Sequence, residues 1–218
     1  MMFRTRIKMC GITRGQDALA GVEAGVDALG FIFVKKSPRY ITPAEAAAII
    51  DVVPPFITTV GVFVDSDPQQ VLETIARCGL NQVQLHGVEG LQTCLKISRA
   101  NPHVAICKAF RVGETMPSLD FNAYRPVIDS VLLDTFVKGQ EGGTGESFDW
   151  HLIETLHLDR PLILAGGVSV ENVREAITTV KPYAIDVNSK IESAPGIKDH
   201  HKLKTFVQEV GRADQQKN

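Results

Sequence analysis

Two kinds of segment alternate along the whole chain. Short runs of apolar and β-branched residues end in Gly, Cys, Asp or His, and longer segments rich in Ala, Leu and Glu follow them. In the longer segments apolar residues recur at the spacing of one helix face, as at Val71, Ile75 and Cys78. The short runs predict strands at Thr5–Met9, Ala28–Phe33, Ile57–Val62, Gln82–Leu85, Val104–Ala109, Ser130–Leu133, Leu162–Leu164 and Ala184–Val187. The longer segments predict helices at Arg14–Ala24, Pro43–Val53, Pro68–Cys78, Glu89–Arg99, Ser118–Tyr124, Asp149–Leu156, Val170–Val180 and Asp199–Val210.

Several predicted helices have clear end signals. Thr42 and Asp67 each precede a Pro, which places a capping residue directly before the first helical position. Ser169 is a suitable cap for the helix that follows it. Gly25 and Gly79 stand where two helices are expected to end.

Strict alternation of strands and helices is typical of parallel strands joined by right-handed crossovers. Eight such units share 218 residues, about 27 residues each, and eight parallel strands close into a barrel. An open doubly wound sheet would have fewer strands and a G-x-G-x-x-G turn after the first one, where this chain has Cys10-Gly-Ile-Thr13. The sequence therefore predicts an α/β protein with a single (β/α)8 TIM barrel. We expect one domain over residues 1–218, with a polar, frayed tail from about Gly211.

Composition narrows the classes of function. Hydrophobic residues make up 44% of the chain and charged residues 22%, values typical of a folded globular protein. The net charge is −2 and the sequence pI is near 6.3, so no nucleic-acid partner is expected, because nucleic-acid binding needs a basic face. The longest apolar stretch, Ala28–Val34, falls well short of the roughly 18 residues that span a bilayer, so no membrane partner is expected.

The cysteines indicate a reducing compartment. Cys10, Cys78, Cys94 and Cys107 form no C-x-x-C pair, and no His lies at zinc-ligand spacing from any of them, so we expect no metal site. Reduced thiols in the cytoplasm are the simplest interpretation. The basic N-terminal segment has no apolar stretch behind it, so no secretory signal is expected.

In a barrel of this type the active site lies at the carboxyl ends of the strands. The residues that follow the predicted strands are therefore candidates, and they are Lys8, Cys10, Gly11, Lys35, Lys36, Arg39, Asp65, His86, Arg111, Asp134, Gly142–Gly145, Gly166, Gly167, Asp186, Asn188 and Ser189. Barrels often bind phosphate with the loops after strands seven and eight. Gly166 and Gly167 allow close backbone approach, and the helix after Ser169 would present unpaired N–H groups. Alternatively, the two glycines only form a tight turn.

Four side chains at strand ends have both a functional and a structural interpretation. Asp134 directly follows an apolar strand, where partial burial favours a protonated carboxyl group suited to general acid catalysis. Alternatively, it caps the next loop. Cys10 is either a reactive thiol or merely a small buried one. Arg39 either binds an anion or forms a surface ion pair, and His86 either lines the pocket or hydrogen-bonds within its own turn.

Motifs at the strand ends follow one another in a characteristic order from about Lys8 to Val207. They are Lys8-Met-Cys-Gly-Ile-Thr13, Gly30-Phe-Ile-Phe33 with Ser37-Pro-Arg39, Gly61-Val-Phe-Val64, Val83-Gln-Leu-His-Gly87, Leu132-Leu-Asp134, Gly142-Gly-Thr-Gly145 with Phe148-Asp-Trp150, Ile163-Leu-Ala-Gly-Gly167, and Pro195-Gly196 with Lys198-Asp199. In this order they resemble the phosphoribosylanthranilate isomerase family. Each motif alone is modest, but the full series, each at its expected strand end, is highly specific.

The resemblance implies a (β/α)8 barrel of tryptophan biosynthesis that needs no metal and no organic cofactor. The family isomerises N-(5-phosphoribosyl)anthranilate to 1-(2-carboxyphenylamino)-1-deoxyribulose 5-phosphate by an Amadori rearrangement. The resemblance implies that Cys10 is the general base, Asp134 the general acid and Arg39 the residue that binds the anthranilate carboxylate. The other expected substrate-binding residues, which include the phosphate site, are His86, Gly166, Gly167, Asp186, Asn188 and Ser189.

The residue types suit this chemistry. Opening the furanose ring requires a proton on its leaving oxygen, which a protonated Asp134 can give. The resulting iminium acidifies the C2′ hydrogen, and a Cys10 thiolate can remove it to leave an enamine that tautomerises to the ketone. By strand alternation Lys8 faces the same side as Cys10, and from this spacing we expect Lys8 to favour the thiolate electrostatically.

One segment departs from the family pattern. The family commonly reads Asp-Val-Ser-Ser-Gly-Val-Glu, where this chain reads Asp186-Val-Asn-Ser-Lys-Ile-Glu192. We expect phosphate to be bound by backbone N–H groups here and by Asn188 or Ser189. Lys190 in place of Gly indicates an ordinary backbone conformation. Its ammonium either lies on the barrel rim in water, which we favour, or reaches the phosphate.

Two other functions remain open on the sequence alone. The first is another sugar-phosphate barrel enzyme. A metal-dependent epimerase would need several His and Asp residues converging at strand ends, but His86 is the one His directly at a strand end. An indole-glycerol-phosphate synthase would be expected to have a Lys and a Glu as its acid and base, where this chain has Cys10 and Asp134. The second is a non-catalytic phosphosugar-binding barrel, which would have no need of both Cys10 and Asp134. The expected partner is a small phosphosugar, and the chain is expected to be a monomer or a homodimer.

Overall fold

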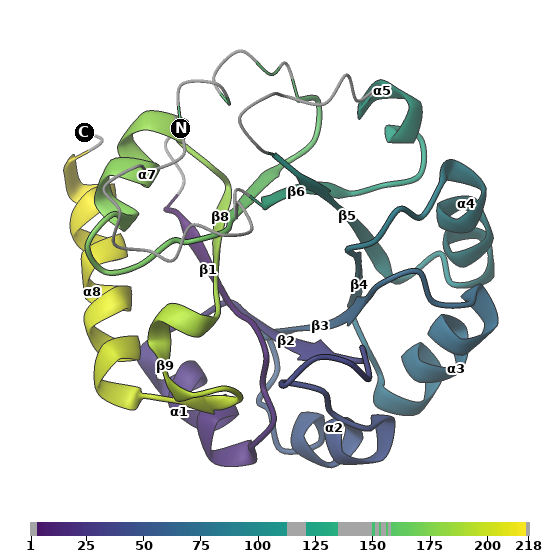
Figure 1. Ribbon diagram of the computed structural model, residues 1–218, viewed down its shortest axis with the longest axis horizontal. Coiled ribbons are helices and arrows are strands. Elements are labelled where there is room, and N and C mark those ends of the chain that lie inside the picture. Colours follow the sequence, from purple (N-terminus) through teal and green to yellow (C-terminus); the bar gives the residue numbers. More distant parts are fainter. Residues whose placement is uncertain are drawn as a thin grey trace.

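The computed structural model describes residues 4–112, 121–134, 150, 153, 156 and 158–216. Eight parallel strands form a closed barrel in sequence order, and helices surround it (Figure 1). The strands are β1 (Arg6–Met9), β2 (Ala28–Ile32), β3 (Thr58–Phe63), β4 (Gln82–Leu85), β5 (Ala105–Arg111), β6 (Ser130–Asp134), β7 (Leu162–Ala165) and β8 (Ala184–Val187). Strand β1 pairs with both β2 and β8, which closes the sheet. The predicted (β/α)8 barrel is confirmed.

The helices follow the strands as the pattern predicts. They are α1 (Gly15–Ala24), α2 (Pro43–Ile50), α3 (Pro68–Cys78), α4 (Leu91–Ala100), α5 (Phe121–Tyr124), α7 (Val173–Val180) and α8 (His200–Gln216). Between β8 and α8 lie a short 3-10 helix, η1 (Ser189–Ile191), and a hairpin of β9 (Glu192–Ala194) and β10 (Ile197–Lys198). The predicted loop Gly142–Gly145 and most of the predicted helix Asp149–Leu156 lie outside the described residues.

Local capping signals set several helix ends correctly. The Thr42 hydroxyl accepts from the Glu45 N–H, and the Glu45 carboxylate accepts from the Thr42 N–H, which completes a capping box at the start of α2. At the start of α3 the Asp67 carboxylate accepts from the Gln69 N–H at 2.8 Å. Gly25 and Gly79 end α1 and α3 in the left-handed conformation. These ends were predictable because each cap bonds to backbone groups only a few residues away.

The start of α7 differs from the prediction. The helix begins at Val173 rather than Val170. The Ser169 N–H donates to Asn172 Oδ1 at 2.8 Å, and Asn172 Nδ2 donates to the Gly167 carbonyl at 3.1 Å. The turn before α7 is therefore closed by Asn172, Ser169 is not the helix cap, and its N–H is already used.

The end of α8 also differs, because the helix continues to Gln216. The expectation of a frayed tail from about Gly211 is wrong for residues 211–216. Ala213 is fully buried, and Asp214 accepts from both the N–H and the hydroxyl of Thr5 at 2.7 Å. The polar composition of this segment does not predict these contacts, because Thr5 lies near the other end of the chain.

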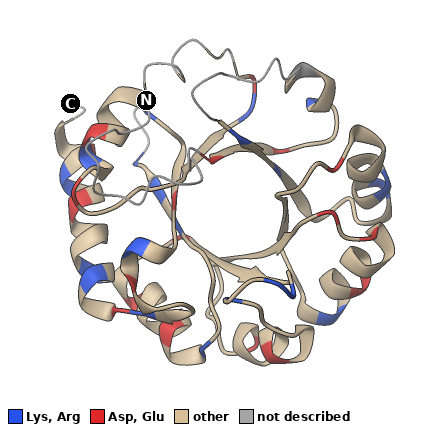
Figure 2. Ribbon diagram, viewed as in Figure 1, with Lys and Arg blue, Asp and Glu red and all other residues tan. Residues whose placement is uncertain are grey.

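Side chains on the two faces of the strands have different roles. Outward residues such as Ile7 and Ile185 pack against the helices in the main core. Inward residues of the later strands form a smaller apolar cluster of Cys107, Ala109, Leu132, Ile163, Ala165 and Ala184. A packed interior therefore supports the polar residues at the strand ends. The outer helices carry both signs of charge side by side (Figure 2), in keeping with the small net charge. Within the described residues, no helix is long and apolar enough to cross a membrane.

Candidate active site

A cavity of about 350 Å³ lies at the carboxyl ends of the strands. Its lining residues are Cys10, Ile32, Arg39, Val62, Gln84, His86, Asp134, Ala165, Gly166, Gly167, Val168, Asp186, Asn188, Ser189 and Lys190. Every residue that we expected to be catalytic or substrate-binding is among them. The volume suits a small organic ligand.

Cys10 directly follows β1 and lies beside a buried ion pair. Lys8 Nζ donates to both carboxylate oxygens of Asp186 at 2.9 and 3.0 Å, and the two residues are register partners across the β1–β8 contact. Gly30 on β2 leaves room for this group. A Cβ at Gly30 would come within 2.9 Å of the Cys10 Sγ and 3.1 Å of the Lys8 Nζ, so a larger residue there would displace the thiol.

The surroundings of Cys10 act on its pKa in opposite directions. Burial raises the pKa of Cys10 above its ordinary value, and the nearby Lys8 charge lowers this pKa only in part. Burial opposes the charge on Lys8, but attraction to Asp186 and Cys10 raises the pKa of Lys8 overall. Lys8 therefore acts on Cys10 in the expected direction, but it does not outweigh burial, and its direct partner is Asp186.

Asp134 ends β6 and contacts His86, which follows β4. His86 Nε2 lies 3.1 Å from Asp134 Oδ2, and His86 Nδ1 lies 2.8 Å from the amide nitrogen of Gln84. With the Gln84 amide nitrogen as the donor, Nδ1 accepts and the ring proton lies on Nε2, toward Asp134. Sequence analysis placed His86 in the pocket but missed Gln84. The available signal was its place two residues before His86, on the same inward face of the strand.

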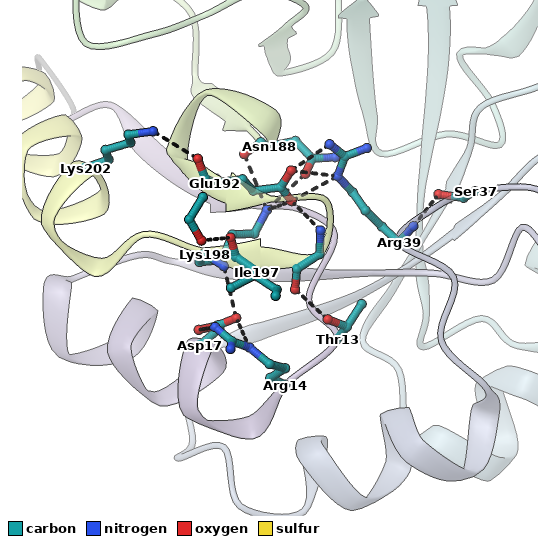
Figure 3. Close-up of polar contacts among 12 residues, drawn as sticks. Thr13, Arg14, Asp17, Ser37, Arg39, Asn188, Glu192, Ile197, Lys198 and Lys202 are labelled. Atoms are coloured by element: carbon teal, nitrogen blue, oxygen red, sulfur yellow. Dashed lines mark hydrogen bonds and ion pairs between the residues drawn. The ribbon is translucent and has the colours of Figure 1, made fainter.

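Arg39, in the loop after β2, forms a half-buried ion pair rather than a surface one. Its Nε donates to both carboxylate oxygens of Glu192 at 2.9 and 3.0 Å, and its Nη2 donates to Oε2 at 2.6 Å. Figure 3 shows Glu192 between Arg39 and Lys198, whose Nζ donates to Glu192 Oε1 at 2.8 Å. Sequence analysis missed Glu192 and Lys198 as site residues, although both stand inside segments that it quoted.

The glycine pair after β7 and the segment after β8 face the same cavity. Gly166 and Gly167 both have positive φ, and the N–H groups of Gly167 and Val168 have no hydrogen-bond partner within the described ranges. In η1 the first N–H groups lack intrahelical partners, as at any helix start. Lys190 has an ordinary backbone conformation, as predicted, and its side chain is exposed at the edge of the cavity.

The remaining cysteines lie on the helices and the strand that the sequence predicts. Cys78 and Cys94 lie on α3 and α4 and Cys107 lies on β5, and all four cysteines of the chain are buried free thiols. In the part of the chain that the structure describes, no three His, Cys, Asp or Glu side chains come together as ligands for a metal ion.

A family profile described as N-(5'phosphoribosyl)anthranilate (PRA) isomerase matches residues 7–209 of the chain. The N-(5'-phosphoribosyl)anthranilate isomerase of Geobacter sulfurreducens is 48% identical over 203 residues, which cover 93% of this chain and 96% of that protein. The enzyme of the same name from Nitrosospira multiformis is 46% identical over 206 residues, which cover 94% of this chain and 96% of that protein.

Solved structures give the same result. Phosphoribosyl anthranilate isomerase from Thermotoga maritima superposes with a TM-score of 0.86 at 43% identity, over 95% of this chain and 99% of that one. A phosphoribosyl anthranilate isomerase in complex with reduced 1-(o-carboxyphenylamino)-1-deoxyribulose 5-phosphate superposes with a TM-score of 0.82 at 40% identity, with the same coverage. A structure of monomers generated from the dimeric Thermotoga maritima enzyme matches with a TM-score of 0.77 at 38% identity, over 95% of this chain and 98% of that one.

Proposed function

The chain belongs to the N-(5'-phosphoribosyl)anthranilate isomerase family, and we propose that it converts N-(5-phosphoribosyl)anthranilate to 1-(2-carboxyphenylamino)-1-deoxyribulose 5-phosphate in tryptophan biosynthesis. The observation that carries the proposal is one cavity whose lining brings together a carboxyl group, a thiol, a guanidinium and two loops with backbone donors. Asp134 and Cys10 are the acid and base, Arg39 is the cation for a carboxylate, and the loops after β7 and β8 supply backbone donors for a phosphate.

In the first step Asp134 gives its proton to the furanose ring oxygen. The C1′–O bond breaks, the oxygen keeps the electron pair and becomes a hydroxyl, and the lone pair of the anthranilate amine nitrogen forms the iminium. His86 contacts the same carboxyl group, and Gln84 fixes the imidazole by its contact with Nδ1. The role of His86 is therefore to orient the acid as well as to line the pocket.

In the second step Cys10, which reacts as the thiolate, removes the C2′ proton and becomes a thiol. The electrons of the C2′–H bond form the enamine and neutralise the iminium, and the enol then tautomerises to the ketone. The cationic iminium favours the thiolate at the moment when the base is needed, because an opposite charge stabilises an anion in a buried site. Lys8 acts in the same direction, and Asp186 holds Lys8 beside the thiol.

Two anion subsites fix the ends of the substrate. Arg39 binds the anthranilate carboxylate. At the Gly166–Gly167 turn the phosphate accepts hydrogen bonds from the N–H groups of Gly167 and Val168, and it also accepts from Asn188 and Ser189. Asp186 also lines the cavity. Its carboxylate is the acceptor that we assign to a sugar hydroxyl.

The wider setting follows from the same proposal. The reaction is internal acid–base chemistry, so the enzyme uses no metal and no organic cofactor, and its rate should be insensitive to a chelator. The whole chain works as one domain, in the cytoplasm, as a monomer or a homodimer. The relative from Thermotoga maritima is described as dimeric, and sedimentation of the purified protein distinguishes the two states.

The direct test is turnover. Purified protein is mixed with freshly made phosphoribosylanthranilate, and the loss of anthranilate fluorescence is followed with and without a chelator. We expect conversion at the same rate in both. A protein that leaves the substrate to its spontaneous breakdown would contradict the proposal.

A further inference from the structure

The hairpin after β8 holds two charged side chains behind the wall of the cavity. Glu192 begins β9, Lys198 ends β10, and the two are register partners. Both are buried, and neither lines the cavity, whereas their partners Arg39 and Asn188 do. The hairpin is therefore connected to the cavity lining through these two partners (Figure 3).

The hairpin is anchored to the first βα unit. The carboxylate of Asp17 on α1, which is fully buried, accepts from the Lys198 N–H at 3.1 Å. The Thr13 hydroxyl donates to the Gly196 carbonyl at 2.6 Å. These contacts hold Glu192 in place independently of any ligand.

Glu192 occupies one edge of the Arg39 guanidinium. The Nε and Nη2 groups both donate to its carboxylate, while Nη1 has no hydrogen-bond partner among the described residues. A guanidinium has five N–H donors, and Nη1 with the second Nη2 proton forms another fork of carboxylate geometry. Since Arg39 lines the cavity, this second fork is the part left for a ligand.

Gly11 allows the arginine and Asn188 to pack this closely. Its φ is +76°, and a Cβ there would come within 2.7 Å of Arg39 Cδ and 2.8 Å of Asn188 Oδ1. Lys198 Nζ donates to the same Oδ1 at 2.9 Å, which fixes the amide with its nitrogen as the remaining donor. Lys198 therefore orients Asn188 while it also bonds to Glu192.

The charges of this cluster do not cancel. Arg39 and Lys198 are cations and Glu192 is an anion, which leaves one positive charge. Burial raises the pKa of Glu192, but Arg39 and Lys198 hold this pKa below its ordinary value. A partly buried group with one uncompensated positive charge favours an anion at its open edge.

We propose that Glu192 is a positioning residue that sets specificity for the substrate carboxylate, by fixing Arg39 with its free fork toward the cavity while Lys198 holds Glu192. The inference rests on the proposed function, because the carboxylate belongs to that substrate. It assigns to the hairpin the recognition of one end of the ligand.

The test compares two ligands that differ in one group. The first is the reduced 1-(o-carboxyphenylamino)-1-deoxyribulose 5-phosphate, and the second is the same compound made from aniline, which lacks the carboxylate. Calorimetric titration gives Kd for each. The unaltered protein should prefer the carboxylated ligand by roughly tenfold or more, the size expected of a charge-assisted bidentate contact. In Glu192→Gln the preference should fall below about threefold, with the aniline ligand bound within about twofold of its original Kd.

The effect expected of Glu192→Gln is one of alignment and not of charge. Burial lowers the pKa of Lys198, and Glu192 is the group that opposes this. Removing the Glu192 charge takes away an interaction that favours the protonated form of Lys198, which offsets the loss of negative charge. The Gln side chain offers Arg39 one acceptor oxygen in place of two, so the paired contact is lost. Tighter binding of the carboxylated ligand by Glu192→Gln would show that Glu192 only screens Arg39, and it would overturn the proposal.

Glu209→Gln is the matched control. Glu209 on α8 also lies between two cations, Arg174 and Arg212, but outside the cavity. Both Kd values should stay unchanged in this variant. Glu192→Asp keeps the negative charge but places the carboxylate one methylene group farther from Arg39. It should retain part of the preference, and it carries the test if Glu192→Gln does not fold.

The other outcomes distinguish failure of this inference from failure of the proposed function on which it rests. Equal weakening of both ligands in Glu192→Gln would indicate a merely structural role and overturn the proposal. An unaltered protein that binds both ligands alike would place the carboxylate subsite away from Arg39, again overturning it, while turnover of the substrate would still stand. Absence of turnover would contradict the proposed function itself.

Discussion

The two sides of the cavity hold their reactive groups by different means. On the side of β1 and β8, Cys10 lies among formal charges, with the Lys8–Asp186 pair beside it. On the side of β4 and β6, Asp134 contacts the imidazole of His86, which is fixed by an amide. Removing one partner of a buried ion pair leaves an uncompensated charge, whereas removing one amide loses a single hydrogen bond. The environment of the proposed base is thus mainly electrostatic, and that of the proposed acid is set by hydrogen-bond geometry.

The largest effects should come from the reactive groups themselves. Cys10→Ala and Asp134→Ala should each lower kcat by at least about 100-fold, because general acid–base groups contribute roughly 10²–10⁴. Steady-state kinetics measure this, and circular dichroism checks that both variants fold. Cys94→Ala, which removes a buried thiol on α4, should keep full activity. Near-normal turnover in Cys10→Ala would remove the thiol from the mechanism.

Arg39→Ala tests the charged side at the substrate carboxylate. A bidentate charge-assisted contact is worth about 1.5–3 kcal/mol, so KM should rise by roughly tenfold or more while kcat falls less. Measuring kcat and KM separately distinguishes the two effects. An unchanged KM would mean that another cation binds the carboxylate.

Lys8→Met tests electrostatic control of the base. The value of kcat/KM should rise with pH as Cys10 loses its proton. Lys8 lowers the pKa of Cys10, so removing Lys8 should move the rising limb of the pH profile to higher pH. At neutral pH, kcat/KM should then fall by roughly tenfold for every pH unit through which the limb moves. A rising limb that stays in place would show that Lys8 matters only as the partner of Asp186.

Two further variants sharpen this experiment. Lys8→Met with Asp186→Asn also removes the anion that raises the pKa of Cys10, so the limb should move part of the way back. Lys108 on β5 is another buried lysine, which pairs with Glu89 and does not line the cavity. Lys108→Met should cost about 3–5 kcal/mol of stability without moving the limb.

The smallest effect on activity should come from the side of β4 and β6, where a neutral amide contacts His86. Gln84→Met removes the amide that fixes the His86 ring, and kcat should fall about fivefold, the size of one net hydrogen bond, with little change in KM. Gln82→Met is the control, because Gln82 lies on the same strand and face, bonds to Ser130 and does not line the cavity. Equal losses in both variants would mean that Gln84 acts through barrel packing alone.

The fold and the positions of the reactive groups were readable from the sequence because both follow from local pattern. Strand and helix periodicity indicated eight units, and closure of a parallel sheet brings all carboxyl ends to one edge. Cys10 and Asp134 were therefore candidates because of their places directly after apolar runs, and the family resemblance implied their roles. The same reasoning brought Arg39 into the cavity.

The partners of those groups were not readable, because they are chosen across the closed barrel. Glu192 meets Arg39 over a separation of 153 residues, and no local spacing marks that contact. Gln84 sits inside a predicted strand, where a polar residue has no turn or cap to explain it. The polar end of α8 resembled a tail because its anchor, Thr5, lies 209 residues away.

The hydrogen bonds between Asp214 and Thr5 have a consequence for local unfolding of the barrel. They join the last helix to the first strand, next to the β1–β8 contact that closes the barrel. Contacts of such long sequence separation carry a large loop-closure entropy and tend to form after local ones. We expect the β1–β8 pairing to be the first part of the native protein to unfold locally. Hydrogen exchange should then show the β1 amides exchanging through a lower-energy opening than those of β3, and uniform protection around the barrel would contradict this.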